Sequence, residues 1–280
     1  MTSPIRLGIF GWPVAHSKSP QMQEAAARAL GIALCYERFE VPPEGLAAAV
    51  GAKHAAGIDG YNLTVPHKVA IMALVDEVTP AARAIGAVNT VVRRGGRYLG
   101  DNTDAPGLVR SLEDSGVQLS GARVVVLGAG GAARAAVVGL AEAGAKEIRV
   151  LSRRPKQSEA LCRALADAVD CGLEAAPLDE AKRHFGGASL LIQATSATLA
   201  SNPGAQAFAD SLPLEALPDG AAVVDMVYKP LETTLLARAN ARGLLTIDGL
   251  GMLLHQGAIA FEIWTGFEPP LDVMRSALSD

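Results

Sequence analysis

The feature that most constrains the fold is a short apolar run that ends in glycines. Arg123–Leu127 reads RVVVL, and it is followed at once by Gly128-Ala129-Gly130-Gly131-Ala132-Ala133 and then by a segment rich in Ala, Val and Leu. A strand, a G-x-G-x-x-A turn and a helix in this order are typical of a Rossmann fold. The glycines let the backbone approach a pyrophosphate, whose charge the helix N-terminus favours. We therefore expect a dinucleotide at these residues, although glycine turns also end strands for steric reasons alone.

The end of the next candidate strand indicates which dinucleotide binds. NAD-binding chains place Asp or Glu there, about 20 residues after the glycines, to bind the ribose 2′-hydroxyl. This chain has Ser152, Arg153 and Arg154 instead. Two guanidinium groups and a hydroxyl suit a 2′-phosphate, so we expect NADP(H) as the cofactor. The alternative is that both arginines are ordinary solvated loop charges.

Composition restricts the class of protein. The chain has 280 residues, of which 50% are hydrophobic, and a net charge of −4. It is too hydrophobic for a disordered chain, and without a basic stripe it is not expected to bind nucleic acid. No apolar run approaches the ~20 residues of a membrane span, and no export signal is evident, so we expect a cytoplasmic protein without a membrane partner. The three cysteines, Cys35, Cys162 and Cys171, lack metal-ligand spacing, so we expect reduced thiols and no metal.

Short β-branched runs alternate with helical windows along the whole chain, which predicts α/β architecture with parallel sheets. The candidate strands are Arg6–Phe10, Tyr36–Val41, Gly60–Val65, Val88–Arg93, Arg123–Leu127, Glu147–Leu151, Ser189–Gln193, Val223–Val227 and Leu244–Ile247. The candidate helices are Pro20–Leu30, Pro43–Ala55, Lys68–Leu74, Ala105–Asp114, Gly131–Glu142, Lys156–Ala168, Thr233–Ala241 and Leu250–Trp264. Two α/β units in tandem are expected, with the last helix returning to the first unit.

Polar residues gather at strand and helix ends in the first unit. Ser17 and Ser19 precede a helical window, where two hydroxyls could bind a small carboxylate. Strand alternation places Asn62 and Thr64 on one face, and Lys68 then begins the next helical window, close to the positive end of its dipole. A lysine in that position is a catalytic candidate. The alternatives are a helix cap for Ser19 and a solvated side chain for Lys68.

Two further polar residues follow candidate strands. Asn89 lies in Gly86-Ala87-Val88-Asn89-Thr90, and Asp104 ends Asp101-Asn102-Thr103-Asp104. Asp104 could also be the N-cap of the helix that follows it. Each residue has an ordinary structural explanation, but together they occur where open α/β sheets bind ligands.

The polar and glycine-rich segments together resemble the shikimate dehydrogenase family, which includes shikimate and quinate dehydrogenases. The matching blocks run in family order over nearly the whole chain: Gly11–Pro20, Tyr61–Lys68, Gly86–Thr90, Asp101–Asp104, Gly128–Arg134, Asp225–Pro230 and Asp248–Gln256. The resemblance implies two α/β domains, an N-terminal substrate-binding domain and a Rossmann-type, doubly wound NADP-binding domain, with an active-site cleft between them. We expect residues 1–104 and 249–280 to form the first domain and residues 105–248 the second.

The activity that the resemblance implies is the reversible, NADP-linked reduction of 3-dehydroshikimate to shikimate, in the chorismate branch of aromatic amino-acid biosynthesis. The substrate would be a cyclic hydroxy-carboxylate, and a homodimer is the assembly we consider, although the sequence does not report the oligomeric state. Lys68 and Asp104 would be the catalytic pair. The positions implied for the substrate carboxylate and hydroxyls are Ser17, Ser19, Thr64, Tyr228, Asn62, Asn89, Asp104 and Gln256. The positions implied for the cofactor are Gly128, Ala129, Gly130, Gly131, Ala132, Ser152, Arg153, Arg154, Met226, Gly249 and Met252.

Two stretches depart from the family pattern. Gln193 and Thr198 stand where the family commonly has Asn and Gly, which puts the shape of that loop in doubt. Ser152-Arg153-Arg154 replaces the more common Asn-Arg-Thr, and this difference bears on the choice between NADP and NAD.

Two alternative functions remain. One is a paralogue that acts on quinate or an amino-substituted analogue; the other is a non-catalytic NADP-binding sensor, against which the retention of Lys68 and Asp104 argues.

Overall fold

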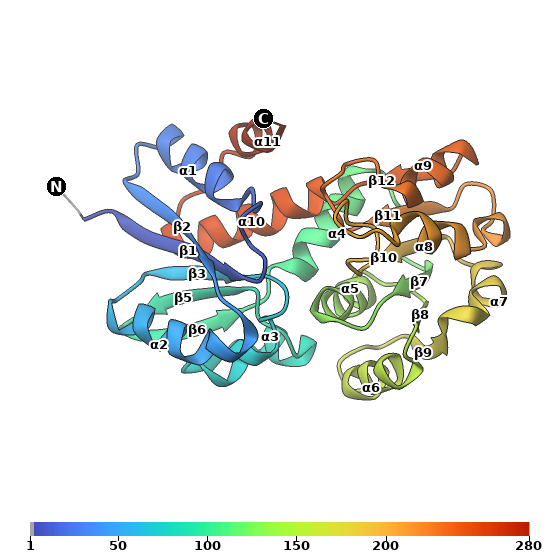
Figure 1. Cartoon of the computed structure of the whole chain (residues 1–280), viewed down its shortest axis with the longest axis horizontal. Coiled ribbons are helices and arrows are strands. Elements are labelled where there is room, and N and C mark those ends of the chain that lie inside the picture. Colours follow the sequence, from blue (N-terminus) through green and yellow to red (C-terminus); the bar gives the residue numbers. More distant parts are fainter. Residues whose placement is uncertain (1–2, 280) are drawn as a thin grey trace. The chain divides into compact units, whose positions relative to one another are not determined.

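The computed structural model describes residues 3–279, and the chain divides into two compact α/β units. Unit 1 consists of the described residues up to Thr103 together with those from Leu254 onward, and unit 2 is Asp104–Leu253. Figure 1 shows each unit as a sheet flanked by helices. The prediction of two α/β units is confirmed. No helix within residues 3–279 has the length and apolar character needed to cross a membrane.

Unit 1 is built on a mixed sheet with the strand order β2-β1-β3-β5-β6-β4. Its strands are β1 (Ile5–Gly11), β2 (Leu34–Glu40), β3 (Gly60–Leu63), β4 (Glu77–Val78), β5 (Thr90–Arg94) and β6 (Arg97–Asp101). Its helices are α1 (Ser19–Ala29), η1 (Pro43–Gly45), α2 (Leu46–Ala55), η2 (Ala70–Ala73), α3 (Pro80–Ile85), most of α10 (Leu250–Thr265), and α11 (Leu271–Ser279). The C-terminal helix α11 packs beside α1 (Figure 1).

The prediction of a parallel sheet is wrong for two of the five strand pairings of unit 1. β1 pairs in parallel with β2 and β3, but β5 runs antiparallel to both β3 and β6. The connection between β5 and β6 is Gly95-Gly96, and both glycines have positive φ, 58° and 83°. Such a two-residue glycine turn makes a hairpin and therefore antiparallel strands. This hairpin was not predicted, and neither were β4, β6, α3 and α11 of unit 1.

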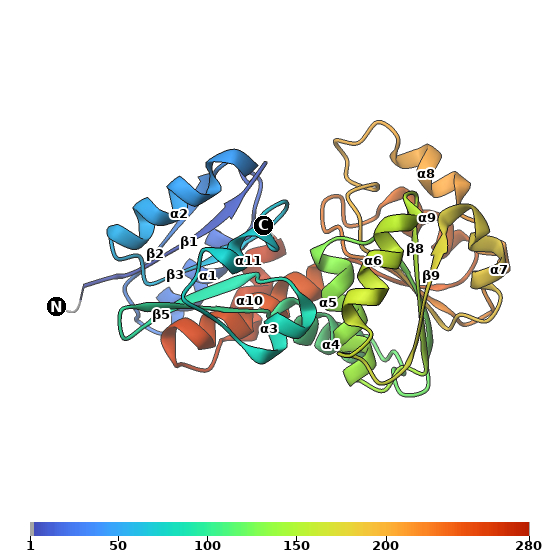
Figure 2. The same cartoon turned by 90° about the horizontal axis from the view of Figure 1, so that it is seen from below.

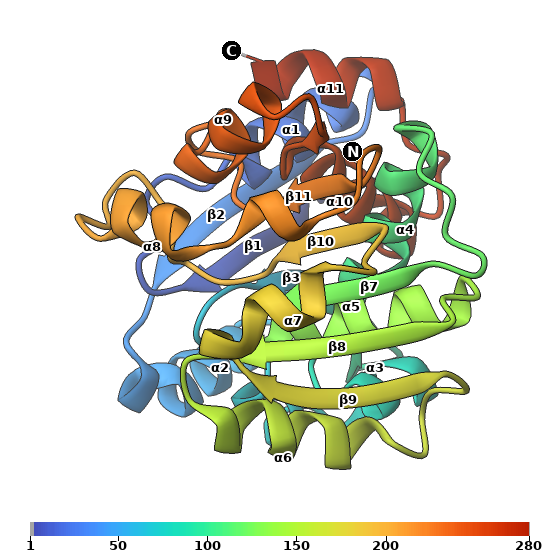
Figure 3. The ribbon, with the colours of Figure 1, turned by 90° about the vertical axis from the view of Figure 1, so that its right-hand side faces the viewer.

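Unit 2 has a parallel sheet with the strand order β12-β11-β10-β7-β8-β9, which is the doubly wound Rossmann order (Figure 3). Its strands are β7 (Arg123–Leu127), β8 (Glu147–Ser152), β9 (Gly172–Pro177), β10 (Leu190–Gln193), β11 (Ala222–Asp225) and β12 (Leu245–Ile247). Its helices are α4 (Asp104–Asp114), α5 (Gly131–Glu142), α6 (Pro155–Leu165), η3 (Leu178–Glu180), α7 (Ala181–Phe185), α8 (Ala205–Ser211), η4 (Leu214–Ala216) and α9 (Thr234–Ala241).

Helices cover both faces of the unit 2 sheet, α5 and α6 on one side and α7 to α9 on the other (Figure 2). Val125 and Leu127 alternate with Val124 and Val126 along β7, and all four are buried. Val125 and Leu127 belong to the apolar core that includes Phe185 of α7 and Leu235 of α9. Burial on both faces explains why this strand reads as a continuous apolar run.

Helix α10 packs on the unit 1 sheet through one tryptophan. The indole Nε1 of Trp264 donates to the backbone oxygen of Val91 on β5, at 2.9 Å. Gly60 of β3 leaves room for the ring: a Cβ there would lie 2.7 Å from the same oxygen and would overlap the indole. The glycine is therefore required by a close approach.

We expect Gly60→Ala to lower the free energy of unfolding by about 1–3 kcal/mol, because the new methyl group has backbone on one side and the indole on the other. Gly51→Ala is the matched control. It lies in α2 with open space around its Cβ, so it should be neutral or stabilise by about 0.5–1 kcal/mol. Urea denaturation of both variants measures the difference, and equal midpoints would contradict the packing argument.

A buried polar network joins the ends of β10 and β11. The Asp225 carboxylate accepts hydrogen bonds from the Val227 backbone N–H at 3.0 Å and the Thr233 hydroxyl at 2.8 Å. Thr198 and Gln193 are also hydrogen-bonded to it. Burial raises the pKa of Asp225, and these hydrogen bonds oppose the rise. The network therefore holds one ionisable group in the core of unit 2.

We expect Asp225 to make unit 2 less stable as pH rises. A carboxyl group whose folded pKa lies above its unfolded value of 3.8 binds its proton more tightly when folded, so its contribution to stability falls as pH rises through the folded pKa. Asp225→Asn removes this titration. The difference in unfolding free energy, variant minus wild type, should increase as pH rises from the unfolded pKa of 3.8 to the raised folded pKa and then level off.

Urea denaturation across that pH range measures the trend. A difference for Asp225→Asn that stays flat across the range would show that the buried carboxyl group does not titrate as proposed.

Candidate functional site

Ser17 and Ser19 lie at the start of α1, as expected. Ser19 is the first residue of the helix, and its backbone N–H donates to the Ser17 hydroxyl oxygen at 3.3 Å. Both serines are buried. Arg38 of β2 donates from Nη2 to the Ser17 backbone oxygen at 2.6 Å, and Lys18 donates from Nζ to the Leu278 oxygen of α11. The turn is thus held from both sides, with two hydroxyls at a helix N-terminus.

The amide of Asn62 is fixed by three neighbours. Its Nδ2 donates to the backbone oxygen of Asn89 and to the Thr90 hydroxyl, both at 3.0 Å. Its Oδ1 accepts from the Tyr36 hydroxyl at 2.6 Å. Because the backbone oxygen of Asn89 can only accept a hydrogen bond, the side-chain atom of Asn62 that faces it must be the nitrogen Nδ2.

Asn89 connects three segments of unit 1. Its Oδ1 accepts from the Thr103 backbone N–H at 2.7 Å and from the Thr90 hydroxyl at 3.0 Å. Its Nδ2 donates to the Thr103 hydroxyl at 3.0 Å and lies 3.4 Å from Gln256 Oε1 on α10. The structure therefore brings Asn62, Asn89 and Gln256 together in one network, although Gln256 is far from the other two in the chain.

Thr64 and Lys68 follow β3, and both are half-buried. We expected Lys68 to begin a helix, but this prediction is wrong. Lys68 lies in a turn before the short η2. Pro66 removes a backbone donor from this segment. The Lys68 backbone oxygen accepts from Val88 N–H at 2.7 Å, which places Lys68 next to the segment that carries Asn89.

Asp104 belongs to unit 2, where it is the first residue of α4. The side chain is 3% exposed. A carboxylate at a helix N-terminus is stabilised by the helix dipole. Behind it, α4 packs closely on α5, because a Cβ at Gly139 would lie 3.0 Å from the Ala105 oxygen.

The glycine turn has the geometry that the motif predicts. Gly128 follows β7 with φ of 118°, and a Cβ there would lie 2.6 Å from the Thr195 methyl group. A Cβ at Gly130 would meet nothing within 4 Å among the described residues. Gly131 begins α5, and its N-cap residue, Gly130, makes no side-chain capping hydrogen bond. Ala129 and Ala132 are half-buried on either side. The open backbone at an uncapped helix N-terminus fits a pyrophosphate.

Of the three residues expected at the ribose 2′-phosphate, one is buried and two are exposed. Ser152 ends β8 and is buried, and its hydroxyl donates to the Arg154 backbone oxygen at 2.8 Å. Arg153 and Arg154 are exposed, and Arg154 precedes α6. The hydroxyl thus shapes the turn, and the two guanidinium groups remain accessible to an anion.

Met226 and Gly249 lie against each other in unit 2. A Cβ at Gly249 would overlap the Met226 backbone oxygen, and Gly249 N–H donates to the Val227 oxygen at 3.2 Å. Met252 is one turn further along α10 and is 9% exposed. Tyr228 is half-buried in the loop after β11.

The loop with Gln193 and Thr198 is ordered by the network around Asp225. Gln193 Nε2 donates to Thr198 Oγ1 and to the Thr195 oxygen, both at 2.9 Å, and its Oε1 accepts from Thr195 N–H at 2.7 Å. The φ of Thr198 is not positive. A residue other than glycine therefore fits there without backbone strain.

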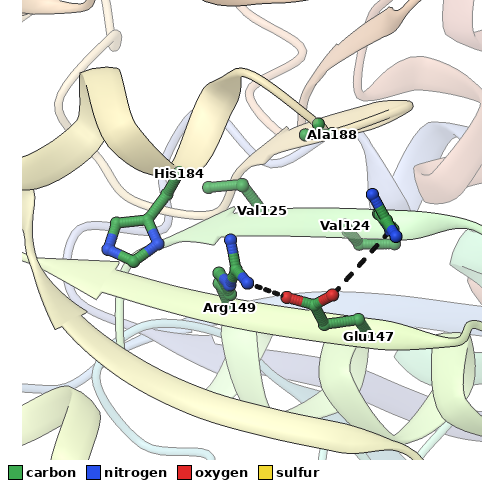
Figure 4. A pocket seen from close by; sticks show the side chains of 8 residues that line it. Val124, Val125, Glu147, Arg149, His184 and Ala188 are labelled. Carbon is green, nitrogen blue, oxygen red and sulfur yellow. Dashed lines mark ion pairs between the residues drawn. The ribbon is translucent and has the colours of Figure 1, made fainter.

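A pocket of about 160 Å³ also lies in unit 2 (Figure 4). It is lined by Arg123, Val124, Val125, Glu147, Arg149, His184, Gly187 and Ala188. Arg123 and Glu147 begin β7 and β8, whereas the glycine turn follows the other end of β7. Glu147 pairs with both Arg123 and Arg149 (Figure 4), and Arg149 also pairs with Glu174, so two carboxylates compensate the two positive charges within the protein.

Sequence reasoning missed Tyr36, Thr90, Thr103 and Arg38 as neighbours of the predicted site residues. Tyr36 and Arg38 are two residues apart on β2, and strand alternation places them on one face. That spacing was the available signal. Within residues 3–279, no group of three or more His, Cys, Asp or Glu side chains is arranged to hold a metal ion.

Family models match most of the chain. The one described as the shikimate dehydrogenase substrate binding domain matches residues 9–91, and the one for shikimate/quinate 5-dehydrogenase matches residues 110–203. The shikimate 5'-dehydrogenase C-terminal domain matches residues 249–278.

Curated relatives are similar over nearly their full length. Shikimate dehydrogenase (NADP(+)) of Symbiobacterium thermophilum is 45% identical, covering 97% of this chain and 92% of that protein. The protein of the same name from Geobacter metallireducens is 46% identical, with 96% and 94% covered.

Solved structures agree with these matches. Shikimate 5-dehydrogenase from Thermus thermophilus in complex with NADP(H) and shikimate is 40% identical, with a TM-score of 0.84 and 98% of each chain covered. Quinate dehydrogenase from Corynebacterium glutamicum in complex with NAD is 32% identical, with a TM-score of 0.88 and 98% of each chain covered. The chain belongs to the shikimate dehydrogenase family.

Proposed function

We propose that this chain is an NADP-dependent oxidoreductase that reversibly reduces 3-dehydroshikimate to shikimate. The observation that carries the proposal is the network around Asn62, Asn89 and Gln256, which joins residues of three sequence blocks in one unit. Relatives at 45% and 46% identity named shikimate dehydrogenase (NADP(+)) support it.

Unit 1 would bind the substrate. Asn62, Asn89 and Gln256 supply amide groups suited to ring hydroxyls, together with the Asp104 carboxylate of unit 2. The serines at the start of α1 supply hydroxyl donors beside a helix dipole that favours a carboxylate. The positions proposed for the carboxylate are Ser17, Ser19, Thr64 and Tyr228. Polar groups of this kind fix the orientation of a small ligand.

Unit 2 would bind NADP(H), and its residues fit that group. Gly128 to Ala132 leave open backbone at the N-terminus of α5, and Arg153 and Arg154 are accessible for the 2′-phosphate. Met226, Gly249 and Met252 are proposed for the nicotinamide end. Ser152 would act by shaping the arginine loop, because its hydroxyl donates to Arg154.

Lys68 and Asp104 would serve the chemistry. NADPH supplies the hydride when it is bound. The ketone oxygen then gains negative charge, which requires a proton donor or a cation within hydrogen-bond reach. We assign that role to the Lys68 ammonium group. Asp104, as a carboxylate, would orient a substrate hydroxyl and the lysine, and neither residue would form a covalent bond to the substrate.

We also propose that the protein acts in the cytoplasm and has no nucleic-acid partner, which its net charge of −4 and free cysteines support. A homodimer remains a prediction, and sedimentation analysis of the purified chain would measure it.

The decisive assay follows the reduction of NADP⁺ by the absorbance of its nicotinamide, with either shikimate or quinate as the substrate. We expect faster turnover of shikimate. Quinate has one extra hydroxyl, a difference that a few contacts can accept or reject. The similarity to a quinate dehydrogenase makes quinate the proper competitor. Faster turnover of quinate would favour that activity, and NADPH binding without turnover of either acid would favour a sensor.

We expect Lys68→Ala to lower kcat about 10²- to 10⁴-fold, because loss of a positioned proton donor acts on the transition state. KM for shikimate should change by less than about threefold. Lys182→Ala, an exposed lysine of α7, is the control and should retain wild-type kcat. Near-normal turnover of Lys68→Ala at saturating substrate would remove the lysine from the chemistry.

We expect the double variant Arg153→Ala/Arg154→Ala to raise KM for NADP⁺ about 10- to 100-fold, because charge-assisted hydrogen bonds to the 2′-phosphate are lost. KM for NAD⁺ should stay the same, since NAD⁺ lacks that phosphate. Arg163→Ala in α6 is the control and should change neither constant. A wild type that uses NAD⁺ as well as NADP⁺ would overturn the assignment.

A further inference from the structure

The pocket beside the first residues of β7 and β8 contains polar groups that the proposed function does not use. Among the buried side-chain nitrogen and oxygen atoms of residues 3–279, four have no hydrogen-bond partner. Three of the four belong to residues that line this pocket: Nε of Arg149 and both ring nitrogens of His184. Buried polar atoms of native proteins are nearly always hydrogen-bonded, to the protein, to water or to a ligand. The pocket is therefore a candidate binding site.

His184 is the most deeply buried polar side chain of the pocket. It lies on α7 and is 6% exposed. Glu180 Oε2 is 3.7 Å from His184 Nε2, which is too far for a hydrogen bond. An imidazole carries at least one N–H donor in either protonation state. His184 thus brings a donor to the pocket for which residues 3–279 supply no acceptor.

The strand register places Arg149 under α7. Arg149 is the partner of Val125 on β7 and of Glu174 on β9, so these three side chains share one face of the sheet. Val125 belongs to the same apolar cluster as Phe185 of α7, which identifies this face as the one that α7 covers. The Arg149 guanidinium and the His184 ring therefore line the pocket from two different elements (Figure 4).

The guanidinium groups of the pocket are compensated in charge but keep unused donors. Glu147 pairs with Arg149 Nη2, and its other oxygen lies 3.9 Å from Arg123 Nε. Arg149 Nε is 3.3 Å from Glu174 Oε2 without forming a hydrogen bond. Each guanidinium has five N–H bonds, more than these carboxylate contacts use. The pocket is thus close to neutral and rich in hydrogen-bond donors.

Size and chemistry restrict the ligand. The pocket volume of about 160 Å³ is below the ~300–1,000 Å³ of sites for larger organic ligands. A metal ion does not fit, because arginine N–H groups cannot be ligands and no group of three or more His, Cys, Asp or Glu within residues 3–279 is arranged to hold one. Donors on β7, β8 and α7 suit an anion that has oxygens on several sides.

We propose that this pocket binds a small tetrahedral oxyanion, sulfate or phosphate, through Arg123, Arg149 and His184. It is a second anion site of unit 2: Arg123 begins β7, whereas the glycine turn proposed for the pyrophosphate follows the other end of that strand. The anion accepts from Arg149 Nε and from the imidazole, while Arg123 closes the side next to Gly187. Because carboxylates already compensate the arginines, the dissociation constant lies in roughly the millimolar range.

Side-chain NMR of the histidines in the full, isotope-labelled chain tests the proposal at the site itself. We expect sodium sulfate to shift the ring resonances of His184 in a saturable way, whereas sodium chloride at the same ionic strength leaves them unchanged. His184→Leu identifies these resonances by their disappearance. A shift that grows linearly with sulfate, or that chloride reproduces, would show a general salt effect and overturn the proposal. The measurement requires neither shikimate nor NADP⁺, so it is independent of the proposed function.

Arg149→Lys separates hydrogen bonding from charge. Lysine keeps a positive charge beside Glu147 but lacks Nε and the planar fork of donors. Sulfate affinity, measured on the His184 ring, should fall about 3- to 10-fold, the range for loss of one hydrogen bond.

Arg183→Gln is the matched control. Arg183 precedes His184 on α7, is 82% exposed and does not line the pocket. This variant removes a whole positive charge, yet sulfate affinity should stay within about twofold of wild type, because exposed charges are screened. An equal loss of affinity in Arg149→Lys and Arg183→Gln would show attraction by overall charge alone and would overturn the proposal.

Three further anions define the ligand. Equal affinity for inorganic phosphate and glycerol phosphate would assign the phosphate group of an ester, and an ester that binds about tenfold more weakly would assign the free ion; both results support the site. Acetate that binds as tightly as sulfate would contradict it, because a planar carboxylate cannot meet donors on three sides.

The melting temperature of His184→Leu distinguishes a ligand-binding histidine from a structural one. Replacing an unpartnered buried polar group by an apolar one is neutral or stabilising, so without sulfate the variant should melt at the wild-type temperature or above it. A decrease of more than about 5 °C would show that the fold itself needs the imidazole and would overturn its assignment to an anion.

Discussion

The site in unit 1 depends on the requirement that buried amides be hydrogen-bonded. Asn62 and Asn89 are 3% and 1% exposed, and an unpaired buried donor or acceptor costs about 1–3 kcal/mol. Thr90 meets this requirement for both, since its hydroxyl accepts from Asn62 and donates to Asn89. The same bonds that stabilise the core fix which atoms of each amide face a ligand. The residues proposed to bind the substrate therefore also contribute to the stability of unit 1.

How much could be predicted from the sequence depended on how local each signal is. The glycine turn, β7 and α5 were predicted with their observed bounds, because strand, turn and helix start are encoded within about twenty residues. The antiparallel pairing of β5 depends on which strand lies beside it, and the hydrophobic pattern of Val88–Arg93 does not specify that neighbour. Gly95-Gly96 did contain the information, through the turn that positive φ permits.

The sequence indicates which residues are candidates for the site, but it does not indicate the hydrogen bonds between them. Asn62, Asn89 and Gln256 occur in recognisable blocks, whereas the hydrogen bond between Tyr36 and Asn62 follows only from the pairing of β1 with both β2 and β3. Lys68 shows the same limit. The backbone hydrogen bond from Val88 N–H to the Lys68 oxygen determines which residues lie next to Lys68, and it joins segments that are distant in the chain.

The departures at Gln193 and Thr198 illustrate how a loop can keep its shape without glycine. In the family pattern, glycine supplies conformational freedom at the second position. Here Thr198 has no positive φ, and its hydroxyl accepts from Gln193 and is bonded to Asp225. The longer amide of Gln193 also reaches both backbone groups of Thr195, whose methyl group lies against Gly128. Hydrogen bonds from Gln193 and to the buried Asp225 side chain thus hold this loop in a conformation that requires no glycine.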